Sequence, residues 1–559
     1  MDIQSSPIRQ INLSVIRSQV KAASFTAIAL GTLHLAGCTP RETEKPRRPN
    51  ILFAISDDQS FRHTSFEGSR FVKTPAFDRI AGEGIYFTSA IAPSPGSAPS
   101  RSALVTGRHH WQNEQSGQHG SSWMKKHVPF IDLLDQNGYV TGLAGKGVAP
   151  FQYARDESDS LWRATNAAGI AHSNIRYEPG SPGDERPATG ISTINYFENF
   201  KYFMENVRKD EPFFFWYGAL EPHRGYELDS WKRSGKSLND AEVPAFFPDH
   251  EVIRGDLLDY AVEIEWFDLH LQRMLAYLEE TGELENTIVI VTSDQGMPFP
   301  RAKANCYEYG IRVPFAVRYP ARFPGNRVVD DPVSFTDLAP TILELTNTSP
   351  RGMLPFSGKS IVHILESKEQ GIVDETKKYV FSGRERHSSS RYLNWGYPQR
   401  AIRSTGFLLI WNLKPERWLA GAPQRIKPGT DDELFPLYGI DENVVHHSDW
   451  AFTDIDASPT KSYIIENHEN QSIRPYFDLA VARRPEFELF DVINDPGNLT
   501  NLSGNPEYSE IENELKEALM QELERSEDPR VVGPYKDIFD SYPRYMNMRE
   551  FPKPDPIAR

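Results

Sequence analysis

Carboxylate and amide side chains follow two apolar runs that we expect to be buried strands. Asp57 and Asp58 come directly after the run at 49–56, and Asp294 and Gln295 follow a later run of the same kind. The carboxyl ends of parallel strands meet at one edge of a sheet, so we expect these four side chains to lie together. Either pair alone is also typical of a helix cap or a turn. Together they predict an all-oxygen metal site, which suits Ca²⁺ better than Mg²⁺ and suits neither Zn²⁺ nor copper.

Cationic side chains are expected at the same edge of the sheet, namely Arg101, Lys146, His223 and Lys303. Singly, each has an ordinary alternative as a surface charge or, for His223, as a cap of the turn at Pro222. Fixed positive charge beside a divalent cation stabilises a multiply anionic group in a transition state. The cluster therefore favours hydrolysis of a sulfate or phosphate ester.

Strands and helices that alternate along the chain are expected to position these residues. Short apolar runs predict strands at 49–56, 138–144, 212–219, 286–293 and 313–319. Apolar residues that recur every three or four positions predict a long helix across 257–278. This alternation predicts an α/β fold, with a large mixed, mainly parallel sheet sandwiched between helices.

The pattern changes near residue 375. The segments YVFSGRE, GFLLIWN and FELFDVIN are separated by long polar loops, and an amphipathic helix follows late in the chain. We therefore predict an N-terminal catalytic domain at 49–375 and a C-terminal subdomain at 376–559, built from a smaller antiparallel sheet plus a helix. The polar stretch 414–474 is interpreted equally well as a substrate-facing insertion or as a surface loop.

The N-terminal segment is typical of an export signal. It has a positive flank, a short apolar run at 22–35 and small residues before Cys38, and the run is too short to span a membrane. The sequence LAGC resembles a bacterial lipobox, and an ordinary signal peptide with an incidental cysteine is the alternative. We predict a lipoprotein signal peptide at 1–38, lipidation of Cys38 and a tether at 39–48. The protein is then expected in the bacterial periplasm or at the cell surface, as an outer-membrane lipoprotein.

The composition of the chain limits the classes of molecule that it is expected to bind. The chain has 559 residues and a formal net charge of −16, so no electropositive face is expected and nucleic acid is excluded as a partner. Its two cysteines, Cys38 and Cys306, cannot build a disulfide framework or a cysteine metal site in the mature chain. An anionic substrate therefore needs a local basic pocket. The sequence leaves the oligomeric state open.

The segment SAPSRSALVTG, which runs from Ser97 to Gly107, resembles the sulfatase signature, in which Cys or Ser is followed by any residue, Pro, Ser and Arg. The segments ILFAISDDQ, GLAGK, FWYGALEPHRGY, IVIVTSDQG and FELFDVINDPGNLTNLS also resemble sulfatase segments, in the order of that family. The chain thus resembles a type I sulfatase of the alkaline phosphatase superfamily. Short segments are most similar to heparan N-sulfatase-like members and to bacterial polysaccharide sulfatases.

The resemblance implies roles for the residues singled out above. Ser97 is expected to be oxidised by a formylglycine-generating maturation enzyme, and a hydroxyl of the hydrated aldehyde would attack sulfur. Arg101 would stabilise that hydroxyl, and Lys146 and Lys303 would hold sulfate oxygens. His223 would protonate the leaving oxygen. The expected ligands of one Ca²⁺ are Asp57, Asp58, Ser97, Asp294 and Gln295.

One position departs from the family pattern. The family usually has Lys, any residue and His after the third strand, but Lys146 is followed here by Gly147 and Val148. The histidine that assists the formylglycine hydroxyl is therefore missing. His109 or His110 is a candidate replacement, and a slower or inactive enzyme is the alternative.

The expected substrate is a sulfated polysaccharide or oligosaccharide, such as an algal polymer like ulvan or a glycosaminoglycan. Five side chains are candidates for binding its uronate or sulfate groups: Arg224, Arg301, Arg384, Arg386 and His387. Each could equally be a partner in a surface ion pair. Three different functions are also compatible with these residues: an N-sulfoglucosamine-type sulfohydrolase, a phosphoesterase that uses Ser97 directly with two zinc ions, and a non-catalytic carbohydrate-binding relative.

Overall fold

The sheet that carries the predicted site has seven strands in the order β4-β5-β1-β6-β7-β2-β8. The structure is a computed structural model that describes residues 47–153 and 162–554. The strand bounds are β1 Asn50–Ser56, β2 Ile85–Phe87, β4 Val140–Gly145, β5 Phe213–Gly218, β6 Thr287–Ser293, β7 Phe315–Arg318 and β8 Arg327–Val329. Strands β4, β5, β1 and β6 run parallel, whereas β7 is antiparallel to both of its neighbours. The prediction of a mixed, mainly parallel sheet is confirmed.

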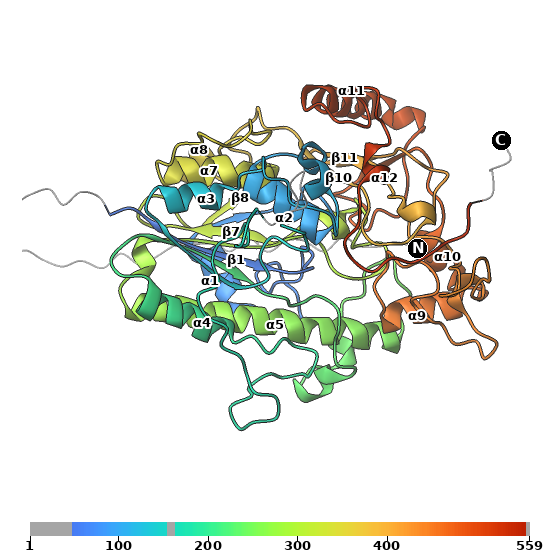
Figure 1. Ribbon diagram of the computed structural model, residues 1–559, viewed down its shortest axis with the longest axis horizontal. Coiled ribbons are helices and arrows are strands. Elements are labelled where there is room, and N and C mark those ends of the chain that lie inside the picture. Colours follow the sequence, from blue (N-terminus) through green and yellow to red (C-terminus); the bar gives the residue numbers. More distant parts are fainter. Residues whose placement is uncertain (1–46, 154–161, 555–559) are drawn as a thin grey trace, which may run out of the picture. The chain divides into compact units, whose positions relative to one another are not determined.

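Helices cover both faces of this sheet (Figure 1). One face is covered by α2 Ser97–Thr106, α3 Phe130–Gln136, α7 Leu338–Leu345 and α8 Val362–Glu366, and the other by α1 Pro75–Glu83, α4 Tyr196–Tyr202 and α5 Glu251–Glu280. Successive side chains of a strand point to opposite faces. Leu52 and Phe53 of β1 accordingly belong to two separate buried clusters. Because both faces are covered, β1 is buried along its whole length.

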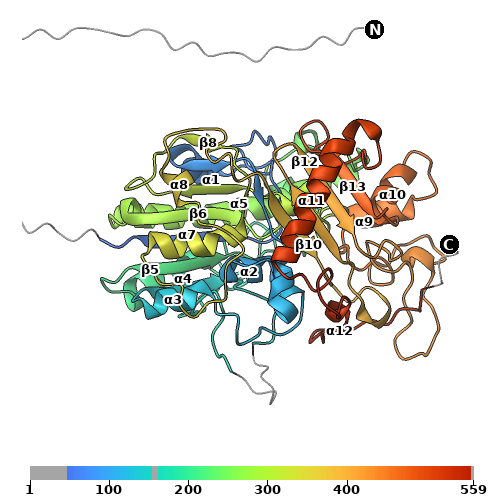
Figure 2. The ribbon, with the colours of Figure 1, turned by 90° about the horizontal axis from the view of Figure 1, so that it is seen from above.

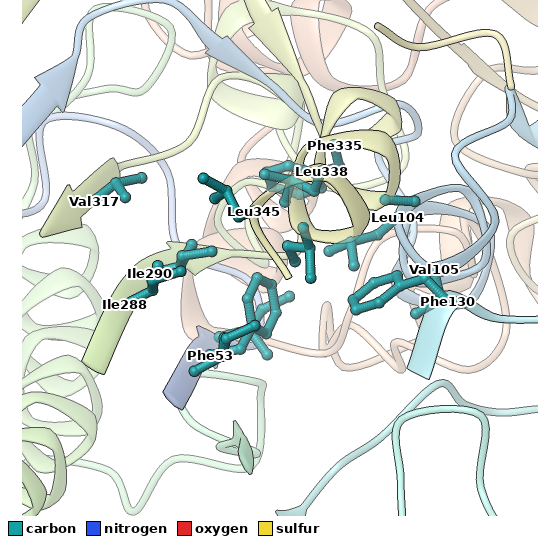
Figure 3. Packing of buried hydrophobic residues seen from close by; sticks show 14 of the residues in the cluster. Phe53, Leu104, Val105, Phe130, Ile288, Ile290, Val317, Phe335, Leu338 and Leu345 are labelled. Carbon is teal, nitrogen blue, oxygen red and sulfur yellow. The ribbon is translucent and has the colours of Figure 1, made fainter. Parts of the chain in front are cut away.

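The core on the α2 side fixes the helix that carries Ser97. Leu104 and Val105 of α2 share one buried cluster with Phe53 of β1, Phe130 of α3 and Leu338 of α7 (Figure 3). Full burial of a leucine side chain contributes about 1.5–3 kcal/mol. The apolar second half of α2 therefore anchors the helix, and its first turn is held beside the sheet.

A second sheet of four antiparallel strands follows later in the chain, in the order β10-β11-β12-β13. Its strands are β10 Val380–Arg384, β11 Gln399–Arg403, β12 Phe407–Asn412 and β13 Phe487–Asp491. Leu409 of β12 packs in one cluster with Leu515 of helix α11 (Ser509–Arg525), whereas Leu408 and Ile410 belong to the cluster on the other face. Figure 2 shows α11 lying across this sheet. The predicted antiparallel sheet with a late helix is confirmed.

The remaining elements in the described ranges are short. Apart from 3-10 and π turns, they are β3 Ala90–Ile91, β9 Val333–Ser334, α6 Glu308–Ile311, α9 Pro459–Glu466, α10 Arg474–Val481 and α12 Ile538–Ser541. No helix among the described residues is both long enough and apolar enough to cross a membrane.

The chain divides into two units, Met1–Arg47 and Arg48–Arg559. The predicted signal peptide, Cys38 and most of the predicted tether lie outside the described residues. Both sheets belong to the second unit. A domain boundary near residue 375 stays a prediction.

Candidate active site

Strand register brings the predicted carboxylates together. Strands β1 and β6 are parallel neighbours with Ser56 opposite Ser293, so Asp57 and Asp294 leave the sheet at the same level. One carboxylate oxygen from each of Asp57, Asp58 and Asp294 lies within 4.8 Å of the other two, and all three residues are buried. Asp58 has a φ of 77°, a left-handed conformation that aspartate adopts more readily than most residues.

Ser97 is the first residue of α2 and contacts this cluster. Its Oγ donates a hydrogen bond to Asp57 Oδ1 at 2.9 Å and accepts one from Gln295 Nε2 at 3.2 Å. The residue before it, Gly96, caps the helix in an extended conformation. The positive end of the dipole of α2 therefore lies beside Ser97, where it favours negative charge.

Arg101 lies one turn after Ser97, on the same face of α2. Its Nε donates to Asp294 Oδ2 at 2.7 Å, and its Nη1 donates to the Lys146 carbonyl at 2.9 Å. Its Nη2 is buried, has no hydrogen-bond partner among the residues that the structure describes, and lies 3.7 Å from Asp57 Oδ1. The guanidinium is thus fixed on two sides and keeps one donor group for an oxygen near Ser97.

Two lysines supply further positive charge. Lys146 Nζ lies 2.5 Å from Asp57 Oδ2. Lys303 Nζ lies 2.7 Å from Asp58 Oδ2 and 2.9 Å from Asp456 Oδ2. Burial alone would lower the pKa of Lys303, but Asp456 and Asp58 raise it, so this ammonium stays charged. Each ammonium group is thus held beside a carboxylate of the cluster.

The carboxylates of the cluster differ in their affinity for protons. Burial alone would raise the pKa of Asp57, but the charges of Lys146 and then His223 hold it well below its usual range. Burial, followed by the neighbouring Asp57 carboxylate, raises the pKa of Asp294 to about 6. The cluster therefore resists full ionisation, and a divalent cation would relieve this repulsion.

The donor set fits one Ca²⁺. Three buried carboxylates, Ser97 Oγ and the side-chain amide of Gln295 offer oxygen ligands of the kind that this cation prefers. Gln295 Oε1 is buried and finds no hydrogen-bond partner in the described part of the chain. A half-turn of the amide, whose two ends are assigned from hydrogen bonding, directs this oxygen to the carboxylates.

His223 stands on the outer side of the cluster. Its side chain is 42 % exposed, and its Nε2 lies 3.9 Å from Asp58 Oδ2. Its Nδ1 lies 3.1 Å from the Arg224 carbonyl, which can only accept, so the proton of this hydrogen bond is assigned to Nδ1. Asp58, His223 and Asp456 could also hold a metal ion. Lys303, however, bonds both of these carboxylates and already balances this second group.

The four arginines that we expected to grip substrate have partners within the protein. Arg224 forms an ion pair with Asp256 and donates to the Pro298 carbonyl at 2.9 Å. Arg384 forms an ion pair with Asp454 at 2.5 Å. Arg301 donates to the Leu479 carbonyl at 3.2 Å, and Arg386 donates to the Tyr542 carbonyl at 2.8 Å. A guanidinium that is removed from water is stable only with such partners. These four side chains are thus engaged within the protein, and a role for them in binding substrate stays a prediction.

His109 and His110 lie away from Ser97. Both follow the C-terminal end of α2, whereas Ser97 begins it, and a helix of 10 residues is about 15 Å long. His109 Nε2 bonds Glu522 at 2.7 Å, and His110 Nδ1 bonds the Gly117 carbonyl at 3.1 Å. Neither ring is placed to serve Ser97.

Sequence reasoning missed Asp456. Asp454 and Asp456 belong to the polar stretch 414–474, and they bind Arg384 and Lys303. This part of the stretch therefore reaches the site, although no motif marks the two aspartates.

A buried hydroxyl among carboxylates and fixed cations, at the carboxyl edge of an α/β sheet, is suited to the hydrolysis of anionic esters. The Sulfatase family model matches residues 49–348, and the chain belongs to that family. It is accordingly a sulfuric ester hydrolase.

Similar proteins agree with this membership. The chain is 25% identical over 530 residues to an ulvan-active sulfatase of Formosa agariphila, with 88% of this chain and 77% of the relative covered. It is 24% identical over 526 residues to the human N-sulphoglucosamine sulphohydrolase, with 88% and 93% covered. A protein solved in complex with its substrate D-glucosamine-2-N,6-O-disulfate has the same fold, with a TM-score of 0.59, 19% identity, and 86% and 99% of the chains covered.

Proposed function

We propose that this sulfatase removes sulfate from a sulfated polysaccharide or its oligosaccharides, through a formylglycine made from Ser97 and with one bound Ca²⁺. The observation that supports the proposal is the set of side chains around Ser97. Its Oγ lies between Asp57 and Gln295 at the start of α2, and Arg101 follows one turn later. Serine would need conversion by a maturation enzyme, because an unmodified serine would be left as an inert sulfate ester.

The chain's own residues supply most of the chemistry. Lys146 and Lys303 bind the sulfate oxygens as fixed charges, and the free Nη2 of Arg101 stabilises the attacking oxygen. His223 gives the proton of Nε2 to the leaving oxygen, since its ring reaches the outer side of the cluster. Ca²⁺, when bound by the carboxylates and Gln295, would add Lewis-acid stabilisation of charge at the nucleophile.

The relatives support a saccharide substrate. One is named for its action on ulvan and another for N-sulphoglucosamine, so both ester and N-linked sulfates are in the range of related enzymes. We propose a sulfated algal polymer or a glycosaminoglycan as the substrate class. An N-sulfoglucosamine-type reaction is the alternative within the family.

A phosphoesterase and a non-catalytic binding protein fit the site less well. A phosphoesterase with two zinc ions would need a second metal position, but Lys303 bonds the carboxylates of the second group. A non-catalytic carbohydrate-binding relative would keep an unconverted Ser97. The mass of the peptide that contains Ser97 separates this case from the enzyme.

We also propose that the protein is exported and anchored by lipid at Cys38. The sequence LAGC after a short apolar run supports this, as does the polar stretch that follows it. The location in the periplasm or at the cell surface follows from the same feature.

The test is sulfate release from a panel of ulvan, glycosaminoglycans and their oligosaccharides. The protein is co-expressed with a serine-type maturation enzyme, and the Ser97→Ala variant is the matched control. We expect the wild type to release sulfate from at least one member, and we expect the variant to fold and to release none. A wild type that carries formylglycine and releases no sulfate from any member would contradict the proposal.

A further inference from the structure

His387 follows strand β10 and lies beside the start of α2. Its Nδ1 is 3.5 Å from the point that a Cβ on Gly96 would occupy. Gly96 is the residue before Ser97, so this ring borders the backbone that carries the nucleophile. Within the described residues, Nδ1 of His387 is buried and has no hydrogen-bond partner.

Contacts between distant segments hold His387 in this place. The backbone N–H of Gly383, in β10, donates to the Pro93 carbonyl at 3.2 Å. The backbone N–H of Ala304, next to Lys303, donates to the Pro95 carbonyl at 2.8 Å. The segment 93–97 is therefore bonded on one side to the strand that leads to His387 and on the other to the loop that carries a catalytic lysine.

The proposed reaction needs a proton acceptor next to Ser97 in its second step. The cluster carboxylates are ion-paired and form the proposed cation site, and ammonium groups such as Lys146 and Lys303 have no lone pair. Val148, at the position where the family has histidine, is aliphatic and fully buried. His223 is already assigned to the leaving oxygen in the proposed function. His387 Nδ1, which lies beside Gly96 without a partner, is therefore a candidate for this proton acceptor.

His387 has an unused lone pair, and a neighbouring histidine does not. Burial lowers the pKa of His387 to about 3, so the resting ring is neutral; the ring is a weak base, and a proton accepted there passes on readily. The ring of His119 lies 5.6 Å away, and burial, followed by His387, also lowers its pKa. Arg544 Nη1, which can only donate, lies 3.3 Å from His119 Nδ1. The Nδ1 lone pair of His119 is thus occupied, whereas that of His387 is not.

We propose that His387 is a catalytic base that accepts, at Nδ1, the proton of the second hydroxyl of the formylglycine hydrate after sulfate transfer. The inference rests on the proposed function. The O–H bond breaks and its electron pair forms the aldehyde C=O bond. The C–O bond to the sulfate group breaks, and its electron pair leaves with sulfate. Water then re-forms the hydrate, and the proton on His387 passes to solvent.

The test compares His387→Ala with His119→Ala in the full-length protein, co-expressed with the maturation enzyme. Formylglycine content is first measured by mass spectrometry. The variants then react with nitrophenyl sulfate, glucosamine sulfates and ulvan oligosaccharides, and the released alcohol, the released sulfate and the intact protein mass are followed separately after rapid quenching. A second variant, His387→Asn, keeps a polar side chain of similar shape that takes up no proton at neutral pH.

We expect His387→Ala and His387→Asn to release one equivalent of alcohol and then to stop, with a sulfo group on the residue at position 97. Steady-state turnover should fall about 100-fold or more, which is the usual contribution of a general base, and added imidazole should restore part of it. His119→Ala should not accumulate the adduct. Because the adduct is read by mass, a variant that is only misfolded does not mimic this result.

Two results would overturn the inference. Equal release of alcohol and sulfate by the His387 variants at the wild-type rate would show that this ring is not the base. Loss of alcohol release without any adduct, in variants that keep formylglycine and fold, would assign His387 to binding or to the first step. A wild type that lacks formylglycine, or that desulfates none of the probes, would instead overturn the proposed function and this inference with it.

Discussion

Asp294 should couple cation binding to pH. Its folded pKa is raised to about 6 from 3.8, by burial and then by Asp57. A change from pH 7 to pH 5 therefore protonates the carboxyl, and at pH 5 only about one tenth of it is ionised. The apparent Kd for Ca²⁺ should then rise about tenfold, which corresponds to roughly 1.4 kcal/mol of binding free energy.

The same shift fixes the sign of the effect on stability. Because the folded pKa of Asp294 is above the unfolded value of 3.8, folding favours the protonated carboxyl. The contribution of this group is fully present below pH 3.8 and is lost as the pH rises through about 6, at a cost of about 3 kcal/mol in the metal-free protein. Ca²⁺ should therefore raise the Tm more at pH 7 than at pH 5.

Isothermal titration calorimetry of the chelator-treated protein measures both quantities. Titrations in two buffers of different ionisation enthalpy give the Kd and the number of protons released. We expect release of about 0.9 proton per Ca²⁺ at pH 5 and about 0.1 at pH 7. The Asp294→Asn variant should bind more weakly and lose most of the proton release. Equal Kd values at the two pH values, with no proton release, would refute the reasoning.

Two further predictions concern stability and location. Arg400 is fully buried and pairs with Glu385 at 2.8 Å and with Asp528 at 2.5 Å. Arg400→Met should therefore lower the free energy of unfolding by about 3–5 kcal/mol, because it leaves these two buried carboxylates without their partner. In urea denaturation the control Arg79→Met, in a partly exposed ion pair, should cost less than about 1 kcal/mol, and equal effects would contradict the account. Cys38→Ser should move the protein from the membrane fraction to the soluble fraction, and an unchanged distribution would count against a lipid anchor.

Local patterns in the sequence predicted much of the fold. The apolar runs that precede Asp57 and Asp294 are strands β1 and β6, and the period of three and four before residue 280 is α5. Burial on both faces makes such strands apolar throughout, and one covered face gives a helix its period, so each signal lies within one short segment. The antiparallel direction of β7 has no such local signal, because direction is set by the path of the chain between strands.

The carboxylate cluster could also be predicted from the sequence. Asp57 and Asp294 each follow a strand directly, and parallel neighbours end at the same edge, so spacing along the chain was enough. The signature that begins at Ser97 then fixed Arg101, because residues four apart share one face of a helix.

Further parts of the site were decided by tertiary structure alone. Arg384 has the sequence context of a surface charge, but the fold buries it against Asp454. Asp456 and His387 reach the site from the C-terminal part of the chain, and each lies more than a hundred residues from its partner there. No period or motif relates residues so far apart, because their meeting depends on how the second sheet docks beside α2. Local patterns thus indicated the class of chemistry and the carboxylate cluster, while the packing of distant segments decided which other charged and titratable groups surround Ser97.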